Sequence, residues 1–565
     1  MMTLPNECLS EIFINLKDYH RTLFSCLLVN RQWCRNAVPI LWSGPISFKN
    51  SKFIRTCLLE LNAEEQSRLI PFRIILPNGP KPLFPYTTYT TIINIDSDDK
   101  DKGIIDWLNH ERNRYCESSN RVRTVNVMNI IQTIKSSLII MFLRTSKKLK
   151  DLRISGKIVN MLSNVLDKSV SLTSLKFSNN KLDINEIKIL AKVLYKNNTL
   201  TSLYITSNQL GIEGGKLLAD ALCKNKTLSL LNIHNNQLYA EGGKAFAKAL
   251  YKNNTLTHLN LSSNHLYPDG GKALAVALYK NTTLTHLYLS SNHLDSEVGK
   301  TLASVLYVNT TLTHLSIWNN QLGPEGGKAL AEALSINKTL IYLSIWSNQL
   351  GSEGGKALAE VLCKNSTLTF LHLHNNQLGP EIGKIFAKAL YKNTTLVHLY
   401  LSSNLFDSEV GKALASVLCV NSTLTHLSLW NNHLDSEVGK AFAEALCKNM
   451  SLTFLNISEN QLGSEGGKAI IEALCKNSTL TSLNLSKNQI CSEIGNALQE
   501  VFYKNTTLTS LNLSKNHLGS EVGIVLAKTL SSNTVLTTLD LCDSKIDDAT
   551  LFTIKNLLKR NKENF

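Results

Sequence analysis

A repeat of 28 residues constrains the fold of this chain more than any other feature of its sequence. From Leu172 to about Ile546, a pattern of the form L-x-x-L-x-L-x-x-N recurs without a change of spacing. Fourteen units fit, and the last unit carries Ser544 where the others carry asparagine. A fixed period of this length indicates a repeat architecture, in which every unit builds the same local structure.

Each repeat combines two periodicities. In the unit that begins at Leu256, Leu259 and Leu261 alternate with polar residues, which predicts a strand with one buried face. An acidic residue follows the asparagine, and a segment such as 327–334 then places apolar residues at helical spacing. Serine and glutamate suit a helix start, because they satisfy free N–H groups and oppose the positive end of the dipole. We therefore predict strand, turn and helix in every unit, with the asparagines satisfying backbone groups where the chain leaves the strand.

This pattern resembles the leucine-rich repeat in its ribonuclease-inhibitor-like form. The resemblance covers residues 172–547 as regular repeats. It implies an α/β solenoid, shaped as a horseshoe with a parallel inner sheet and outer helices. One unit cannot bury its own apolar face, so neighbouring units must stack and the ends of the stack need caps. Residues 548–565 are predicted to form the C-terminal capping helix.

Residues 1–48 are predicted to form a small, separate all-α unit of three short helices. Its motifs, in chain order, are Leu4-Pro5-x-Glu7-x-Leu9-x-x-Ile12-Phe13, Cys26-Leu27-Leu28-Val29-Asn30-Arg31-Gln32-Trp33 and Leu41-Trp42. A unit of this size buries little surface, so we expect it to need a partner. The alternative is a plain helical cap on the solenoid.

These motifs together resemble the F-box. The resemblance implies docking to the Skp-type adaptor of a cullin-RING (SCF) ubiquitin ligase. By the same resemblance, the adaptor-binding residues are Leu4, Pro5, Leu9, Ile12, Phe13, Leu28 and Val29. Trp33 and Trp42 could belong either to this contact or to the core of the unit.

The stretch between the F-box-like unit and the regular repeats follows no clear period. Residues 49–121 are predicted to be a connector and N-terminal cap, with helices at 53–61 and 103–116. Residues 122–171 are predicted to be irregular first repeats. They begin with a strand at 122–127 and a helix, and a second unit follows at Leu149, Leu152 and Ile154. Atypical end repeats are expected, because the open core of a solenoid must be covered.

The formal net charge of +15 is largely a property of the repeats. One lysine recurs on the predicted outer helices, three residues after an acidic residue: Lys216, Lys244, Lys272, Lys300, Lys328, Lys356, Lys384, Lys412, Lys440 and Lys468. This spacing favours a solvated, ion-paired face. No arginine occurs between Arg153 and Arg560, so the repeats lack bidentate guanidinium contacts to phosphate or guanine. The pattern argues against a nucleic-acid partner.

The positions of the cysteines and of the N-x-[ST] sites bear on the compartment in which the protein works. Five of the twelve cysteines share a repeat position with tyrosines, which indicates packing and reduced thiols: Cys223, Cys363, Cys419, Cys447 and Cys475. The N-x-[ST] sites, such as Asn365 to Thr367, lie at the helix-to-strand return and are interpreted as structural. Residues 1–7 do not resemble a signal peptide, and the longest apolar run, near 138–143, is too short to span a bilayer. We expect an intracellular protein of the cytoplasm, the nucleus or both, with no membrane partner.

No group of residues in the sequence predicts catalysis. Gly299-Lys300-Thr301 resembles the end of a phosphate-binding loop, but Leu294 stands where the first glycine of that motif belongs. The histidines show no zinc-type pairing with cysteines. We therefore expect a non-catalytic protein without metal or cofactor.

The predicted concave face is the strongest functional signal. Three positions of each strand point away from the buried leucines, and in the middle repeats they carry aromatic side chains. The predicted target-binding residues are His258, His286, His314, Trp318, Tyr342, Trp346, Phe370, His372, His374, His398, Tyr400, His426, Trp430 and Phe454. Clustered exposed aromatics favour a protein-binding face, although copying of repeats could also have spread them.

Three classes of function remain for such a chain. The first is a substrate receptor, in which the F-box-like unit binds the ligase adaptor and the concave face binds a protein target. The second is an inhibitor or a GTPase-activating regulator that acts without ubiquitination, and it leaves the N-terminal unit without a role. A nucleotide-dependent sensor would need an NTPase module, which this sequence lacks. We expect a monomer apart from the ligase complex.

Overall fold

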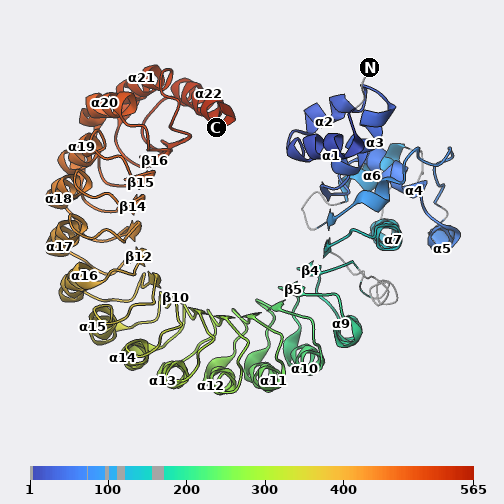
Figure 1. The fold of residues 1–565 in the computed structure, drawn as a ribbon, viewed down its shortest axis with the longest axis horizontal. Coiled ribbons are helices and arrows are strands. Elements are labelled where there is room, and N and C mark those ends of the chain that lie inside the picture. Colours follow the sequence, from blue (N-terminus) through green and yellow to red (C-terminus); the bar gives the residue numbers. More distant parts are fainter. Residues whose placement is uncertain are drawn as a thin grey trace. The chain divides into compact units, whose positions relative to one another are not determined.

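The computed structural model describes residues 4–72, 74–95, 101–110, 121–154, 159 and 171–564. The chain divides into two compact units, Met1–Asn264 and His265–Phe565. Each unit is a series of parallel strands joined by helices, and Figure 1 labels many of these elements along the chain. The leucine-rich-repeat solenoid fold with an N-terminal helical unit is therefore confirmed.

The N-terminal helical unit, called the head below, comprises three helices as predicted. These are α1 (Asn6–Asn15), α2 (His20–Cys26) and α3 (Arg31–Leu41). Helix α3 packs against both others, and Asn30 starts it by accepting a hydrogen bond from the Trp33 backbone N–H at 2.8 Å. The buried core of the head consists of Leu9, Phe13, Leu23, Cys26 and Ala37.

The sheet begins earlier in the sequence than predicted. Strands β1 (Pro45–Ile46), β2 (Ile92–Asn94) and β3 (Asp151–Ile154) pair in parallel, one after the other. The helical elements around them are α4 (Ser51–Leu58), α5 (Ala63–Ser67), α6 (Lys102–His110), α7 (Arg121–Thr145) and short 3-10 turns at Ile70–Phe72 and Tyr86–Tyr89. The predicted helices near 53–61 and 103–116 are thus present, and the second lies outside the described residues beyond His110.

The predicted strand at 122–127 is wrong, because α7 runs through it without a break. The stretch alternates like a strand, but it leads into a long apolar segment whose side chains, such as Ile134, Leu138 and Phe142, are fully buried. Burial of a whole helix outweighs a short local alternation.

By length and composition, Val127–Thr145 could cross a membrane, yet 72% of that window is buried inside the structure. The core helix of a folded domain passes the same test, so this is weak evidence for a membrane segment.

The regular repeats alternate short strands and helices in both units. In the first unit they are β4 (Ser174–Ser178), α9 (Ile184–Lys196), β5 (Ser202–Thr206), α10 (Gly211–Leu222), β6 (Leu230–Asn232), α11 (Tyr239–Lys252) and β7 (His258–Asn260). The second unit starts with α12 (Tyr267–Ala277), β8 (His286–Tyr288), α13 (Ser296–Leu306), β9 (His314–Ser316), α14 (Gly323–Leu334), β10 (Tyr342–Ser344), α15 (Gly351–Val361) and β11 (Phe370–His372). It continues with α16 (Pro380–Lys392), β12 (His398–Tyr400), α17 (Ser408–Leu418), β13 (His426–Ser428), α18 (Ser436–Leu446), β14 (Phe454–Asn456), α19 (Gly463–Ala473) and β15 (Ser482–Asn484). It ends with a 3-10 turn (Ser492–Ile494), α20 (Gly495–Lys504), β16 (Ser510–Asn512), α21 (Gly519–Leu530), β17 (Thr538–Asp540) and α22 (Asp548–Asn564).

The strands pair at a constant offset of one repeat. Leu343, for example, lies beside Leu315 on one strand and Leu371 on the other, and all three are fully buried. In the second unit the helices lie on the outside of a curve and the strands on its inside (Figure 1). The predicted C-terminal helix is confirmed as α22.

The asparagines that follow the strands satisfy backbone groups, as predicted. The side-chain amide of Asn376 donates to the carbonyls of Ile345, Leu373 and His374, at 3.0, 3.1 and 3.3 Å. Its carbonyl accepts the backbone N–H of Asn348 at 2.9 Å, so each asparagine links its own repeat to the preceding ones. In the last repeat the hydroxyl of Ser544 donates to the Leu513 carbonyl at 3.0 Å.

A second asparagine position explains the N-x-[ST] sites. The Asn365 side chain is buried, and its amide donates to the Leu334 carbonyl at 2.8 Å. Its carbonyl accepts the N–H groups of Thr367 and Leu368, which turns the chain from helix to strand. The recurring N-x-[ST] motif therefore forms the turn that leads from each helix to the next strand.

The outer helices also behave as the charge pattern predicts. Lys216, Lys244, Lys300 and Lys440 each pair with the glutamate three residues earlier, at 2.8 to 3.2 Å. All cysteines in the described part of the chain are free thiols.

Candidate functional site

Five of the predicted adaptor-binding residues are exposed on the head. Leu4, Pro5, Ile12, Leu28 and Val29 all face solvent, and Leu28 is 80% exposed. Leu28 and Val29 lie in the turn between α2 and α3, which presents them away from the core. Apolar side chains as open as these are unusual in a monomer and indicate a binding surface.

Leu9 and Phe13 lie in the core of the head, which corrects their assignment to the contact surface. Both are fully buried, and the Phe13 ring meets the Trp33 ring edge-on with centroids 5.3 Å apart. Leu9 and Phe13 are one helical turn apart on α1, so they share the face that packs on α3. Their role is to hold the exposed residues in place.

Side-chain hydrogen bonds connect α1, and Leu4 just before it, to α3. The Gln32 side-chain amide donates to the Leu4 carbonyl at 2.8 Å, and the Asn36 amide donates to the Asn6 side-chain oxygen at 3.0 Å. The Ser10 hydroxyl donates to the Asn36 oxygen at 3.2 Å. The backbone at the exposed Leu4 is therefore held by the last helix of the head.

The two tryptophans whose role was open both pack internally. Trp33 lies against Phe13, as described above. Trp42 stacks on Tyr86 and Phe53, with ring centroids 4.5 and 5.4 Å away. Phe53 in turn stacks on Phe142 of α7 at 6.4 Å. Trp42 thus joins the end of the head to the cap.

The second candidate surface is the side of the sheet that faces away from the helices. We call it the sheet face. All fourteen predicted target-binding residues lie on it and are partly exposed. His258 belongs to β7 of the first unit, and the other thirteen belong to β8–β14 or the turns after them in the second unit. Because the leucines between them are buried, alternation along each short strand presents these rings to solvent.

The first residues of strands β8 to β14 form a continuous stack of rings. His286 and His314 are 3.9 Å apart between centroids, Tyr342 and Phe370 are 4.1 Å apart, and the remaining steps range from 4.2 to 5.5 Å. The stack consists of His286, His314, Tyr342, Phe370, His398, His426 and Phe454. Neighbouring strands lie about 4.8 Å apart, so identical positions on in-register strands bring rings to stacking distance.

A second row of rings follows the strands. Trp318 and Trp346 stack with centroids 4.3 Å apart and planes inclined by 7°. His374 stacks on Trp430 at 4.7 Å, reaching across the repeat in which Ser402 occupies this position. Between the two rows, His372 lies 4.9 Å from Tyr400. The rows therefore merge into one aromatic surface over β9 to β13.

Burial lowers the pKa of several histidines of this surface, which favours their neutral form. Burial, assisted by the nearby charge of His374, lowers the pKa of His372 to about 4. Burial likewise lowers the pKa of His258, His398 and His426. A desolvated imidazole loses its proton more easily, because its cation is poorly solvated.

The sheet face in the second unit also lacks charge over most of its length. The residues of strands β8 to β14 are His, Leu, Tyr, Phe, Ser and Asn, and none is aspartate, glutamate, lysine or arginine. The first charged positions appear in later turns, where Lys487 pairs with Glu459 at 2.9 Å. The aromatic surface is therefore a neutral one.

The described residues contain no group of three or more metal-binding side chains. The glycine of the Gly299-Lys300-Thr301 stretch has a packing role: a Cβ there would lie 2.8 Å from the Gly326 Cα of the next helix. This close approach explains why Gly recurs in the repeats without a phosphate-binding loop.

Comparison with protein families gives two matches. Residues 1–45 match the family model described as F-box-like. Nine segments between residues 196 and 527 match the model described as Leucine Rich repeat. The chain is an F-box-like protein with C-terminal leucine-rich repeats. Such proteins are typically adaptors or scaffolds rather than enzymes.

Comparison with curated proteins gives no match. Among solved structures, the yeast Rad7 and Elc1 complex is 18% identical, covering 77% of this chain and 96% of that chain, with a TM-score of 0.43. An internalin (inlF) from Listeria monocytogenes is 23% identical, covering 64% and 86%, with a TM-score of 0.40. The leiomodin-1 actin-binding site 2 is 23% identical, covering 32% and 88%, with a TM-score of 0.24. At these scores none of the likenesses carries an argument about function.

Two groups of exposed rings and side chains were missed from the sequence. Ile14 and Phe24 add to the apolar surface of the head, and both are exposed. In the turns after the strands, His265 stacks on His293 at 5.5 Å, and Tyr267 also stacks on His293 at 5.5 Å. The sequence contains the pattern that predicts this contact, since His265 and His293 are one repeat apart. The predicted surface included strand positions alone, and these two residues lie in the turns.

Proposed function

We propose that this protein is the substrate-recognition subunit of an SCF-type cullin-RING ubiquitin ligase. The head would bind a Skp-type adaptor, and the sheet face would bind a protein target. The observation that carries the proposal is the F-box-like match over residues 1–45 together with the exposed apolar residues of that same segment. We expect such a receptor to act inside the cell, in the cytoplasm, the nucleus or both.

The structure distinguishes the exposed residues of the head from those of its core, and this sharpens the test. The full chain is mixed with a recombinant Skp-type adaptor and the captured adaptor is quantified. A Leu28→Asp/Val29→Asp variant changes only exposed side chains and should lose capture. Tyr19→Asp is the matched control, because Tyr19 is an equally exposed ring of the head outside the predicted contact. Capture by wild type and by both variants alike would contradict the assigned surface, and no capture by wild type would make the head a cap.

The sheet face indicates the chemistry of the target. Stacking covers many of the ring faces, so a partner would contact this surface largely through the edges of the indole, imidazole and phenol rings. Ring edges carry partial positive charge and hydrogen-bond donors. The target that fits is therefore an uncharged protein surface with apolar side chains and hydrogen-bond acceptors. A phosphorylated target would have to use lysines such as Lys487, which already pairs with Glu459.

Ubiquitination in cells tests the receptor as a whole. Wild type is compared with the Leu28→Asp/Val29→Asp variant and with a Trp318→Ala/Trp346→Ala variant. A true target is a protein whose ubiquitination falls with both variants, since both surfaces are needed. A protein that still binds the head variant and keeps its ubiquitination level would instead fit the regulator that acts without ubiquitination. That alternative is not favoured, because it gives the F-box-like head no role.

A further inference from the structure

The last described strand, β17, has one unpaired edge. In the preceding repeat the Thr509 carbonyl accepts the N–H groups of Thr537 and Thr538, and the Leu513 N–H donates to the Asp540 carbonyl. The equivalent groups one repeat later are the Thr537 carbonyl and the Leu541 N–H. Among the described residues the pairing register of β17 is with β16, so these groups face an open edge. An open edge is a template for another strand.

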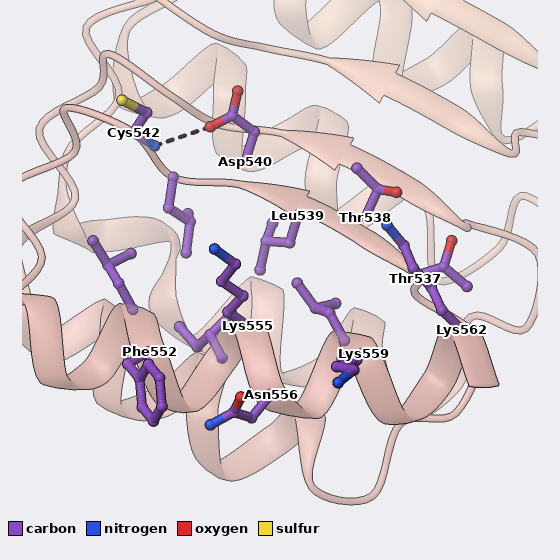
Figure 2. Close-up of a pocket in the computed structure, with 14 residues that line it drawn as sticks. Thr537, Thr538, Leu539, Asp540, Cys542, Phe552, Lys555, Asn556, Lys559 and Lys562 are labelled. Atoms are coloured by element: carbon purple, nitrogen blue, oxygen red, sulfur yellow. Dashed lines mark hydrogen bonds between the residues drawn. The ribbon is translucent and has the colours of Figure 1, made fainter. Parts of the chain in front are cut away.

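An apolar pocket lies beside this edge. It has a volume of about 760 Å³ and lies between β17 and α22, as Figure 2 shows. The strand leucines Leu483 and Leu511 of the two preceding repeats are 1% and 0% exposed, whereas Leu539 at the same position is partly exposed. Leu551 of α22 also lines the pocket, and the Phe552 ring on the same helix is 67% exposed. The core of the solenoid is thus accessible at this end.

The helix side of the pocket is basic. Lys555, Lys559 and Lys562 follow one another along α22 at the pocket (Figure 2). Lys559 lies 3.8 Å from the Glu563 carboxylate on the exposed surface, which is a weak pair. On the strand side the Asp540 carboxylate accepts the Cys542 N–H at 3.0 Å, so its charge is directed toward the turn.

We propose that this open end, formed by β17 and the lysine-bearing face of α22, binds an extended acidic segment of a partner protein. The segment adds a strand along β17 through the Thr537 carbonyl and the Leu541 N–H. Its apolar side chains enter the pocket beside Leu539, and its carboxylates lie along Lys555, Lys559 and Lys562. Strand addition supplies affinity through the main chain, and pockets and charges supply selectivity.

The charges argue against a second copy of this chain as the occupant. Two copies joined edge to edge by a two-fold axis would present the same lysines to each other. Like charges facing each other across an interface disfavour association. The residues that form this site are different from those of the head and of the aromatic rows, so the proposal does not depend on the proposed adaptor or target.

A short synthetic peptide tests the proposal with the full-length chain. The fluorescein-labelled probe carries leucine at the two positions that each repeat buries and glutamate at the outward positions, and binding is followed by fluorescence polarisation. Two further peptides replace the glutamates with lysines or methylate the backbone nitrogens. The acidic probe should bind saturably, and both other peptides should bind at least about fivefold more weakly.

Protein variants separate this site from general basic surface. Lys555→Glu/Lys559→Glu/Lys562→Glu should weaken the acidic probe at least about fivefold. The control is Lys384→Glu/Lys388→Glu/Lys392→Glu on α16, which reverses as many lysines on another helix and should leave binding unchanged. All six side chains reach the surface, and circular dichroism is used to check that both variants remain folded. Equal binding of acidic and basic peptides, or equal loss in the two variants, would overturn the proposal. Concentration-dependent dimerisation that only the α22 variant abolishes would also overturn it, in favour of a second copy.

Discussion

The indole rings of Trp318 and Trp346 lie face to face, with centroids 4.3 Å apart and planes inclined by 7°. Each ring follows its strand at the same repeat position, one repeat apart in the sequence. In-register parallel strands therefore convert a sequence repeat into a stack of rings at about the strand spacing. Aromatic pairs of this kind contribute roughly 0.5–1.5 kcal/mol beyond the area they bury.

The Trp318–Trp346 pair should give an exciton couplet in the circular dichroism spectrum. Two indoles in close contact couple their transitions, whereas an isolated indole does not. Trp318→Phe and Trp346→Phe should each abolish the couplet. Trp430→Phe should keep it, because the ring next to Trp430 belongs to His374. A couplet that survives both of the first two substitutions would show that these rings do not stack in solution.

Asn376→Ala should strongly destabilise the second unit. The substitution removes three bonds donated to backbone carbonyls and the bond accepted from the Asn348 N–H, most of them buried. Each buried polar group left without a partner costs about 1–3 kcal/mol, so the total should reach about 3 kcal/mol or more. Urea unfolding followed by tryptophan fluorescence measures the change.

Asn254→Ala is the control for that substitution. Asn254 is exposed, and its contact is a 3.4 Å bond from Lys226. A surface change of this kind is expected to alter stability by less than about 0.5 kcal/mol. Equal effects of the two substitutions would contradict a structural role for the Asn376 column.

The rows of the sheet face could be predicted from the sequence because two simple rules fix them. Alternation along a strand buries Leu343 and exposes Tyr342, and the constant repeat spacing aligns Tyr342 with Phe370. Neither rule gives side-chain conformation. The contact of His374 with Trp430 across an intervening serine therefore became visible only in the structure.

The irregular parts of the chain were predicted less well, because the local sequence patterns there are compatible with more than one structure. On α1 the apolar residues Leu9, Ile12 and Phe13 form one stripe in the sequence, but only Ile12 faces solvent. Which of these residues are buried depends on how α3 packs against α1, and the spacing of residues along the sequence does not give that packing. Residues 122–127 alternate like a strand, yet the apolar segment that follows extends one helix across them.

His372 should make stability depend on pH in the acidic range. Its pKa is about 4 in the folded protein, below the ordinary value of 6.5, because the ring is buried beside His374. The unfolded chain therefore binds the proton more tightly, and stability falls as pH decreases from 6.5 toward 4. The contribution is up to about 3 kcal/mol, present in full above pH 6.5 and lost below about pH 4.

Unfolding midpoints in urea across this pH range test the effect of His372. His372→Asn should flatten part of the decline between pH 6.5 and 4, because asparagine does not titrate. His20→Asn, which changes an exposed histidine of the head, serves as the control. An unchanged pH profile in the His372 variant would show that this ring is not the group that loses stability.

Arg144→Met should destabilise the cap through Glu65. The Glu65 side chain is 2% exposed, and Arg144 donates to its two oxygens at 2.7 and 2.9 Å. One of these oxygens also accepts the Asn62 N–H, which starts α5. Removing the guanidinium leaves a buried carboxylate without its cation, which typically costs about 3–5 kcal/mol. Adding Glu65→Gln should recover part of this loss, because the amide oxygen still accepts from Asn62 and no charge remains.

Lys216→Met, which breaks the exposed pair with Glu213, should cost no more than about 1 kcal/mol. If the double variant is as unstable as Arg144→Met alone, the loss comes from packing of the arginine and not from the stranded charge.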